Sequence, residues 1–284
     1  MLILKPVFAY RIMNIAVYIG KDELRSDGRL AALERKLRDA GCHIYDLMRK
    51  EDIQDGTDFV LSVGGDGTFL SLAMLVADSG IPVVGVNLGR MGFLSENRPE
   101  DVAEALLGGE YVIEDRALLR ADVATGSPVI DDYPYALNEM TVRRSGAAML
   151  GVDVTLDGIQ LPTYWSDGLV ISTSSGSTAY SLSVGGPIVL PESKVFIISP
   201  IAPHNLNVRP LVVPDSSEIS LKMHSRDGRF ELSVDNRTVE VSEGTEVTVG
   251  MAQFSLKRVR LGRSNFINAL TDKLFWGEDV RNIR

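Results

Sequence analysis

Two glycine-rich segments hold the residues whose types and spacing could do chemistry. The first, Gly64-Gly65-Asp66-Gly67-Thr68, directly follows residues 58–63, whose mostly apolar side chains predict a strand buried on both faces. In an open α/β sheet, ligands bind at the carboxyl ends of the strands. Glycines at that edge let backbone N–H groups approach phosphate oxygens, and the N-terminus of a following helix favours the same anion. The carboxylate of Asp66 would act there as a base or as a magnesium ligand, unless the segment is only a tight turn.

The second segment, residues 85–94, reads Gly-Val-Asn-Leu-Gly-Arg-Met-Gly-Phe-Leu and lies at the end of the next predicted strand. Its glycines allow the chain to lie close to a ligand. Arg90 offers a guanidinium to a phosphate, and Phe93 offers a flat apolar face. The alternative is a glycine turn beside a phenylalanine of the core.

Polar side chains also cluster in the second half of the chain. Asn138-Glu139 lies within a β-like run, residues 136–141, where an amide and a carboxylate together suit a ribose diol or an adenine amine. Asp167-Gly168 opens another predicted strand, and residues 174–183 then hold six Ser or Thr. Hydroxyls at that density suit a polyhydroxylated or phosphorylated ligand, and Tyr180 could stack on a base. A solvent-facing polar pair and a solvated loop are the respective alternatives.

The sequence excludes several other kinds of site. It has no Walker A Gly-Lys-Ser/Thr and no Gly-x-Ser-x-Gly elbow, and Leu70 stands where a dinucleotide fingerprint has its third glycine. The formal net charge of −9 argues against nucleic acid as a partner. The single cysteine, Cys42, permits no internal disulfide and fits a cytoplasmic location, and no spacing specifies a metal site. No apolar run reaches the ~18 residues that span a bilayer, so no membrane partner is expected.

The pattern of elements divides the chain into two domains. The first third alternates strands and helices, which predicts a parallel sheet with crossover helices, one of them over residues 69–77. From about residue 115, short β runs separated by turns predict a mostly antiparallel β domain, and a helical tail is expected to return to the first domain. The predicted units are an α/β Rossmann-like domain, residues 1–116 with 263–284, and a β-rich domain, residues 117–262.

Taken in order, these segments resemble the NAD kinase family over roughly residues 13–275. The Gly-Gly-Asp-Gly core alone is shared with diacylglycerol kinases and phosphofructokinase relatives, so the Asn-Glu pair and the Ser/Thr segment make the set specific. The segments that carry the resemblance are Gly64 to Thr68, Gly89 to Phe93, Asn138-Glu139, Asp167 through Tyr180, and Ser199-Pro200-Ile201-Ala202-Pro203-His204.

The resemblance implies an enzyme that transfers the γ-phosphoryl group of ATP, or of polyphosphate, to the adenosine ribose 2′-hydroxyl of NAD, making NADP. NAD would lie between the two domains, and Asp66 would accept the proton of the hydroxyl. The residues expected to bind NAD are Asp66, Gly67, Phe93, Leu94, Asn138, Glu139, Asp167, Thr178, Ala179, Tyr180, Ser183, Ala202 and Asn236. Those expected to bind phosphate are Gly64, Gly65, Gly67, Thr68 and Arg90.

The resemblance also implies a divalent cation, typically Mg²⁺, and a homodimer or homotetramer. The sequence departs from the family at Asp235-Asn236-Arg237, where relatives often have Asp-Gly-Gln, and at Trp165, which is basic in some of them. Two rival functions stay open on the residues alone. One is a kinase for a lipid or a sugar, and the other is a module that binds NAD without catalysis.

Overall fold

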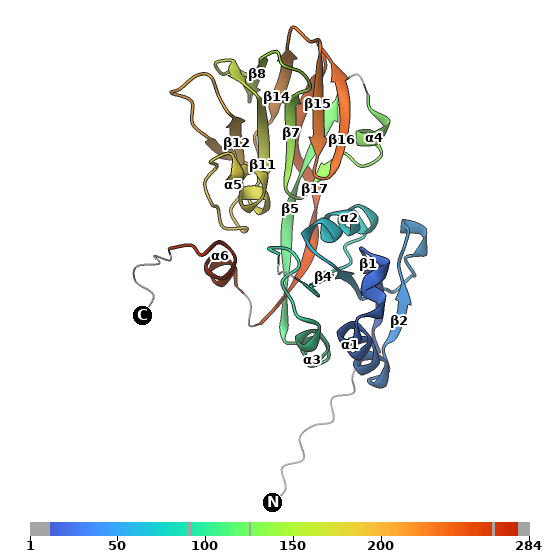
Figure 1. Cartoon of the computed structure of the whole chain (residues 1–284). Helices are drawn as coiled ribbons and strands as arrows, with labels where there is room; N and C mark the ends of the chain where they lie inside the picture. The colour runs from blue at the N-terminus through green and yellow to red at the C-terminus, as the bar shows by residue number, and fades with distance from the viewer. Residues whose placement is uncertain (1–11, 90–91, 125, 263–264, 278–284) are drawn as a thin grey trace, which may run out of the picture. The chain divides into compact units, whose positions relative to one another are not determined.

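The protein is described by a computed structural model that covers residues 12–89, 92–124, 126–262 and 265–277 (Figure 1). The chain divides into two compact units: unit 1 runs to Glu114 and resumes at Lys257, and unit 2 spans Asp115–Leu256. Strands β5 (Tyr111–Val123) and β17 (Glu246–Leu261) contribute residues to both units. The predicted fold class, a parallel α/β sheet followed by antiparallel β structure, is confirmed.

Unit 1 is built on a parallel sheet with helices on its faces. Its elements are β1 (Asn14–Ile19), a 3-10 turn (Asp22–Ser26), α1 (Gly28–Asp39), β2 (His43–Asp46), a second 3-10 turn (Lys50–Asp52), β3 (Phe59–Val63), α2 (Asp66–Val76), β4 (Val83–Val86), α3 (Pro99–Gly108) and α6 (Phe266–Leu274). The strand order is β17-β4-β3-β1-β2. Every residue of β3 is buried, which explains its almost continuously apolar sequence. Helices α1 and α3 pack together, and α2 lies on the other side of the strands in Figure 1.

Local signals set where these helices begin and end. The side chain of Asp27 accepts the backbone N–H of Arg29 at 2.8 Å and so caps α1. Pro99 opens α3, where a missing N–H costs nothing, and Gly109 ends it with a left-handed φ of 68°. Helix α2 begins at Asp66, earlier than the predicted start at residue 69. Asp66-Gly67-Thr68 is therefore the first turn of a helix rather than a free loop.

Unit 2 consists of two antiparallel sheets. Its elements are β6 (Tyr135–Ala136), β7 (Glu139–Arg144), β8 (Leu150–Leu156), β9 (Ile159–Gln160), β10 (Tyr164–Ser166), β11 (Gly168–Thr173), β12 (Val195–Ile201), β13 (Leu211–Pro214), β14 (Ile219–His224), β15 (Arg229–Val234), β16 (Arg237–Ser242), α4 (Pro128–Asp131), a 3-10 turn (Ser175–Thr178) and α5 (Tyr180–Ser183). One sheet has the order β13-β12-β11-β7-β15-β16, and the other includes β10-β8-β14-β17. The predicted β run 136–141 is broken, because Asn138 lies between β6 and β7 and only Glu139 begins a strand.

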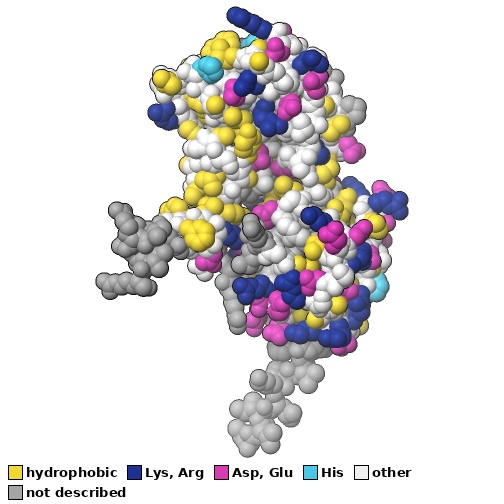
Figure 2. All heavy atoms as spheres, viewed as in Figure 1, with side chains coloured by type: hydrophobic (Ala, Val, Ile, Leu, Met, Phe, Trp, Pro, Cys, Tyr) yellow, Lys and Arg dark blue, Asp and Glu magenta, His cyan; other side chains and the backbone are white. Residues whose placement is uncertain are grey.

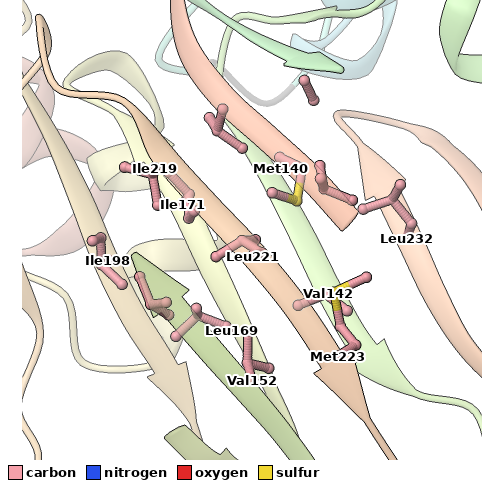
Figure 3. Close-up of a cluster of buried hydrophobic side chains, with 14 of the residues drawn as sticks. Met140, Val142, Val152, Leu169, Ile171, Ile198, Ile219, Leu221, Met223 and Leu232 are labelled. Atoms are coloured by element: carbon pink, nitrogen blue, oxygen red, sulfur yellow. The ribbon is translucent and has the colours of Figure 1, made fainter. Parts of the chain in front are cut away.

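The core of unit 2 lies between these two sheets. Val142, Ile171 and Leu232 project from one sheet and Val152 and Leu221 from the other, and all are buried in one cluster (Figure 3). Alternate residues of each strand face this core, as a two-layer β structure requires. The packed sheets hold the ends of β7 and β11 in fixed register, with Glu139 opposite Ser172.

Removing a core side chain should therefore destabilise unit 2. Leu232 is fully buried, whereas Leu206 is 86% exposed in the same unit. We expect Leu232→Ala to lower the free energy of unfolding by about 2–5 kcal/mol, since the change leaves a cavity. Leu206→Ala should change it by less than about 0.5 kcal/mol. Urea denaturation of the two variants measures the difference, and equal effects would contradict the described core.

Candidate functional site

The carboxylate of Asp66 organises the carboxyl edge of the unit 1 sheet. Oδ2 accepts the backbone N–H of Phe93 at 2.8 Å, and Oδ1 accepts those of Leu94 and Ser95 at 3.0 and 2.9 Å. Three consecutive N–H groups thus converge on one charged acceptor, and hydrogen bonds to a charged group are the stronger kind. The segment that follows β4 is fixed to the first turn of α2 through this side chain.

Glycine is required where the chain approaches this carboxylate. A Cβ on Gly92 would stand only 1.9 Å from Asp66 Oδ1. Thr68 makes a similar demand, because a Cβ on Gly20 or Gly64 would stand 2.1 or 2.3 Å from its Oγ1. The Thr68 side chain is thus wedged between two glycines, so its hydroxyl faces the protein and only its backbone remains for a phosphate.

The other residues expected at this edge differ in their access. Gly65 and Gly67 are exposed, whereas Gly64 is buried. Leu94 is buried at 5% exposure, so its side chain belongs to the protein interior. Phe93 is partly exposed, and its ring lies 6.2 Å from that of Phe266 on α6. Arg90, expected to bind phosphate, lies outside the described residues.

A lysine that no sequence motif indicates also reaches this edge. Lys273 on α6 donates to the carbonyl of Gly92, and its Nζ lies 4.7 Å from the centre of the Phe93 ring. Burial lowers the pKa of Lys273, while the charges of Glu96 and Asp66 act in the opposite direction. Lys273 is more than 180 residues from Gly92 in sequence, so no local pattern indicates their contact.

A second aspartate in unit 2 repeats the arrangement seen at Asp66. Asp235 accepts the backbone N–H groups of Leu137, Asn138 and Glu139 at 2.8, 2.9 and 3.2 Å. It occupies the tight turn between β15 and β16 with a left-handed φ of 50°. Asp235 was not among the residues predicted from the sequence, which include its exposed neighbour Asn236 instead. An Asp-Asn pair between two β runs is a hairpin signal that could have indicated the turn, but not its target.

Glu139 lies beside Asp235 and is electrostatically unusual. Burial and the neighbouring Asp235 raise the pKa of Glu139 to about 8. The pKa of Asp235 is also raised by burial, although the three N–H groups act against that rise. Oε2 of Glu139 is buried without a hydrogen-bond partner among the described residues, while its carboxyl group receives the backbone N–H of Tyr180. Near neutral pH, Glu139 therefore carries a proton and can donate as well as accept.

Three buried hydroxyls of the Ser/Thr-rich segment bond within the protein, and that of the partly buried Thr178 donates to the carbonyl of Ser175 at 3.4 Å. Ser174 donates to Pro191 O, Ser177 to Val189 O, and Ser181 pairs with Ser199. These buried hydroxyls fix the segment and are not available to a ligand. The residues of the segment that were expected to bind NAD keep partial or full exposure: Thr178, Ala179, Tyr180 and Ser183.

The structure brings only some of the unit 2 candidates together. Gly176 packs against Asn138, whose carbonyl oxygen would stand 2.1 Å from a Cβ there, so Asn138, Glu139 and the segment 178–180 are neighbours. Asp167 lies at the far end of β7, roughly 17 Å from Glu139 at the rise of an extended strand. There it pairs with Arg144, 2.8 Å from Nε to Oδ1, and lies near the exposed Ala202.

The described residues contain no cluster of three or more His, Cys, Asp and Glu that could hold a metal ion. They also include no helix long and apolar enough to cross a membrane.

Comparisons with known proteins identify relatives of both units. Residues 23–111 match the model of the ATP-NAD kinase N-terminal domain, and residues 137–261 match that of the ATP-NAD kinase C-terminal domain. An NAD kinase of Flavobacterium psychrophilum is 42% identical over 236 residues, covering 82% of this chain and 80% of the relative. An NAD kinase of Porphyromonas gingivalis is 37% identical over 291 residues, covering 94% and 99%.

Two solved structures are similar to most of the chain. An NAD kinase from Archaeoglobus fulgidus in complex with ATP has a TM-score of 0.71 at 28% identity, covering 87% of this chain and 93% of that one. Yeast NADH kinase complexed with NADH has a TM-score of 0.81 at 24% identity, covering 96% and 90%, and supports the fold.

The raised pKa of Glu139 predicts a pH-dependent stability. Its ordinary value is 4.5, so between about pH 5 and pH 8 the folded protein keeps a proton that the unfolded chain releases. The contribution of Glu139 to stability is therefore lost as the pH rises through this window. Glu139→Gln mimics the protonated form, and its free energy of unfolding should exceed that of the wild type by about 2–4 kcal/mol at pH 8 but not at pH 5.

Denaturation in urea at several pH values measures this difference. The matched control is Glu240→Gln on β16, whose side chain is 53% exposed, and it should follow the wild type throughout. A Glu139→Gln profile parallel to that of the wild type would show that Glu139 is ionised in the folded protein.

Proposed function

The chain belongs to the NAD kinase family and phosphorylates NAD to NADP, and we propose that Asp66 is the base that accepts the proton of the attacking ribose hydroxyl. ATP and NAD are its substrates. The observation that carries the proposal is the position of Asp66, at the first residue of α2 directly after the buried strand β3. That is the edge where a parallel sheet binds ligands, and where the helix N-terminus favours phosphate.

One oxygen of Asp66 keeps the capacity that a base needs. A carboxylate oxygen can accept about two hydrogen bonds. Oδ1 already accepts two backbone N–H groups, whereas Oδ2 accepts one. The free lone pair of Oδ2 is therefore our proposed acceptor for the hydroxyl proton. Because three N–H groups hold the carboxylate still, it needs no reorganisation when the hydroxyl arrives.

Each unit supplies part of the proposed NAD-binding set. In unit 1 these residues are Asp66, Gly67, Phe93 and Leu94, the last through its backbone since its side chain is buried. In unit 2 the protonated carboxyl group of Glu139 and the amide of Asn138 offer both donors and acceptors to a ribose or an amide. The remaining proposed contacts in unit 2 are Asp167, Thr178, Ala179, Tyr180, Ser183, Ala202 and Asn236.

NAD kinases in general need a divalent cation, and we propose Mg²⁺ for this chain. Mg²⁺ is usually held by one or two carboxylates together with the phosphates of the substrate. In this mode the protein need not hold the ion by itself, because the substrate phosphates supply further ligands. When bound, the cation neutralises charge on the phosphate chain. A homodimer or homotetramer and a cytoplasmic location remain predictions from the sequence.

Incubation of the purified protein with NAD, ATP and Mg²⁺ tests the reaction itself. An NADP-specific dehydrogenase would report the product, which we expect to require all three additions. Binding of NAD without formation of NADP would instead favour a non-catalytic NAD-binding module. Phosphorylation of a lipid or a sugar, but not of NAD, would favour the other rival.

Replacing Asp66 tests the proposed base. We expect Asp66→Asn to lower kcat by about 10²–10⁴, the usual contribution of general-base catalysis. Because Asp66 also holds residues 93–95, the same variant should have a lower melting temperature. NAD affinity, measured by calorimetry, should change by no more than severalfold.

Asp58→Asn is the matched control, since Asp58 also accepts a backbone N–H, that of Asn14 at 2.9 Å, but at the opposite end of the strands. It should keep normal turnover. A kcat of Asp66→Asn within tenfold of the wild type would remove Asp66 from the role of base. Loss of NAD binding in parallel with kcat would show that Asp66 acts only by positioning the loop.

A further inference from the structure

The side chain of Lys273 in unit 1 forms no ion pair with a carboxylate of the described residues. Its hydrogen-bond acceptor is the carbonyl of Gly92, and its other neighbour is the Phe93 ring. Within the described part of the chain, no carboxylate lies within ion-pair distance of Lys273. Taking an ammonium group partly out of water is costly unless charge compensates it. A neutral carbonyl and an aromatic face compensate it only in part, so the position suits a cation that receives an anionic ligand.

The neighbouring Arg258 cannot serve in the same way. Its side chain is 3% exposed, with Nη2 2.5 Å from Glu96 Oε1 and Nη1 3.2 Å from Glu114 Oε2. Its Nε donates to the carbonyl of Leu94 at 3.4 Å. Arg258 is thus already neutralised inside the protein. Lys273, by contrast, could bind a ligand by giving up a single hydrogen bond, the one to the carbonyl oxygen of Gly92.

A cavity of about 750 Å³ adjoins Lys273 on the carboxyl side of β4. Asn87 and Gly89 enter it directly after the strand, while β4 pairs with β3 up to Val63↔Val86. Because β3 and β4 are neighbouring parallel strands, the cavity lies at the same sheet edge as the strand end that leads into Gly64 and Gly65. Its size is that of a small-molecule site. The lining residues are Arg29, Asn87, Gly89, Arg98, Pro99, Glu100, Asp101, Asp272 and Lys273.

The charges of this cavity are mixed. Arg29 is engaged with Asp27 at 2.7 Å and with the carbonyl of Leu88 at 2.7 Å. Arg98 is exposed, and among the described residues it has no ion-pair partner. Three carboxylates line the same walls, and Figure 2 shows basic and acidic side chains intermixed on the visible face of unit 1. Such a wall disfavours a bare polyanion but suits one that carries a divalent cation.

We propose that this cavity receives the polyphosphate chain of the phosphoryl donor, and that Lys273 contacts the terminal phosphate beside Asp66. The inference rests on the proposed function and adds a residue and a subsite to it. Gly92 connects the two groups, because its carbonyl bonds Lys273 and its Cα approaches the Asp66 carboxylate. Asp66 and Lys273 thus both approach Gly92, which brings a proposed base and a proposed phosphate-binding cation to one residue.

The role of Lys273 leaves the chemical balance of the transfer unchanged. A bond forms between the ribose 2′-oxygen and the terminal phosphorus, and the bond from that phosphorus to the bridging oxygen breaks. The hydroxyl proton goes to Asp66, and the shortened polyphosphate leaves with the electron pair. Lys273 takes no part in the proton transfer and donates a hydrogen bond to the negatively charged transferred group.

Substitution of Lys273 separates this role from a structural one. We expect Lys273→Met to lower kcat/KM for ATP by about ten- to a hundredfold, the effect of losing a hydrogen bond to a charged group. Its affinity for NAD, measured by calorimetry, should stay within about twofold, and Lys273→Arg should recover much of the activity. Arg98→Met should raise the KM for ATP by several-fold. The matched control is Lys36→Met on α1, where the lysine is exposed and pairs with Glu104 at 3.4 Å.

Calorimetry with Mg²⁺ and either ATP or tripolyphosphate, in the absence of NAD, tests the cavity independently of turnover. Both should bind the wild type, and both should bind Lys273→Met and Arg98→Met more weakly. Failure of tripolyphosphate to bind or to compete with ATP would overturn the assignment of the cavity to a phosphate chain.

Lys273 would be purely structural if Lys273→Met lost affinity for NAD and ATP equally and had a lower melting temperature. In that case Lys273→Arg would also fail to recover activity. If the wild type formed no NADP, the proposed function would fail while the binding measurements still decided the cavity.

Discussion

The candidate site depends on one interaction, a carboxylate that accepts three consecutive backbone N–H groups. Asp66 does this for residues 93–95. The carbonyl oxygen of Leu94 in turn accepts a hydrogen bond from Arg258, so N–H and C=O groups of this short segment are both bound by side chains. Without the carboxylate, three N–H groups in a partly buried segment would lack acceptors, and each unpaired group costs about 1–3 kcal/mol. The residue proposed to react is therefore also the residue that builds its own surroundings.

This dual role explains why the surrounding positions are glycines or buried side chains. Gly92 must lack a side chain because the carboxylate occupies that volume, and Gly20 and Gly64 must lack one because Thr68 fills theirs. Phe69, directly after this turn, is fully buried and anchors the start of α2. The helix N-terminus, the carboxylate and the loop thus form one rigid body, and a phosphate that binds there meets preset N–H groups.

Local patterns in the sequence were enough to predict the sheet and much of the first helices, because those elements depend on periodicity and on caps. Leu30, Leu33 and Leu37 are buried on one face of α1, as their spacing indicates. Long-range pairing was beyond such patterns. Asp235 lies 96–98 residues from the N–H groups that it binds, and Lys273 lies still further from Gly92. The many Ser and Thr residues of segment 174–183 predicted ligand contacts too broadly for a similar reason. Ser174, Ser177 and Ser181 turn inward and bond groups that are distant in sequence.

The same motif has different neighbours in the two units, because a second carboxyl group lies beside Asp235. At Asp66, the hydrogen-bond partners are three backbone N–H groups and include no second carboxyl group. At Asp235, burial disfavours ionisation of the carboxyl group, and the same holds for the adjacent Glu139, where repulsion by Asp235 adds to it. The pKa values of both groups therefore rise. Two carboxyl groups so close hold at least one proton between them near neutral pH. One aspartate thus keeps a base ready, and the other turns its glutamate neighbour into a neutral hydrogen-bonding group suited to an uncharged part of a ligand.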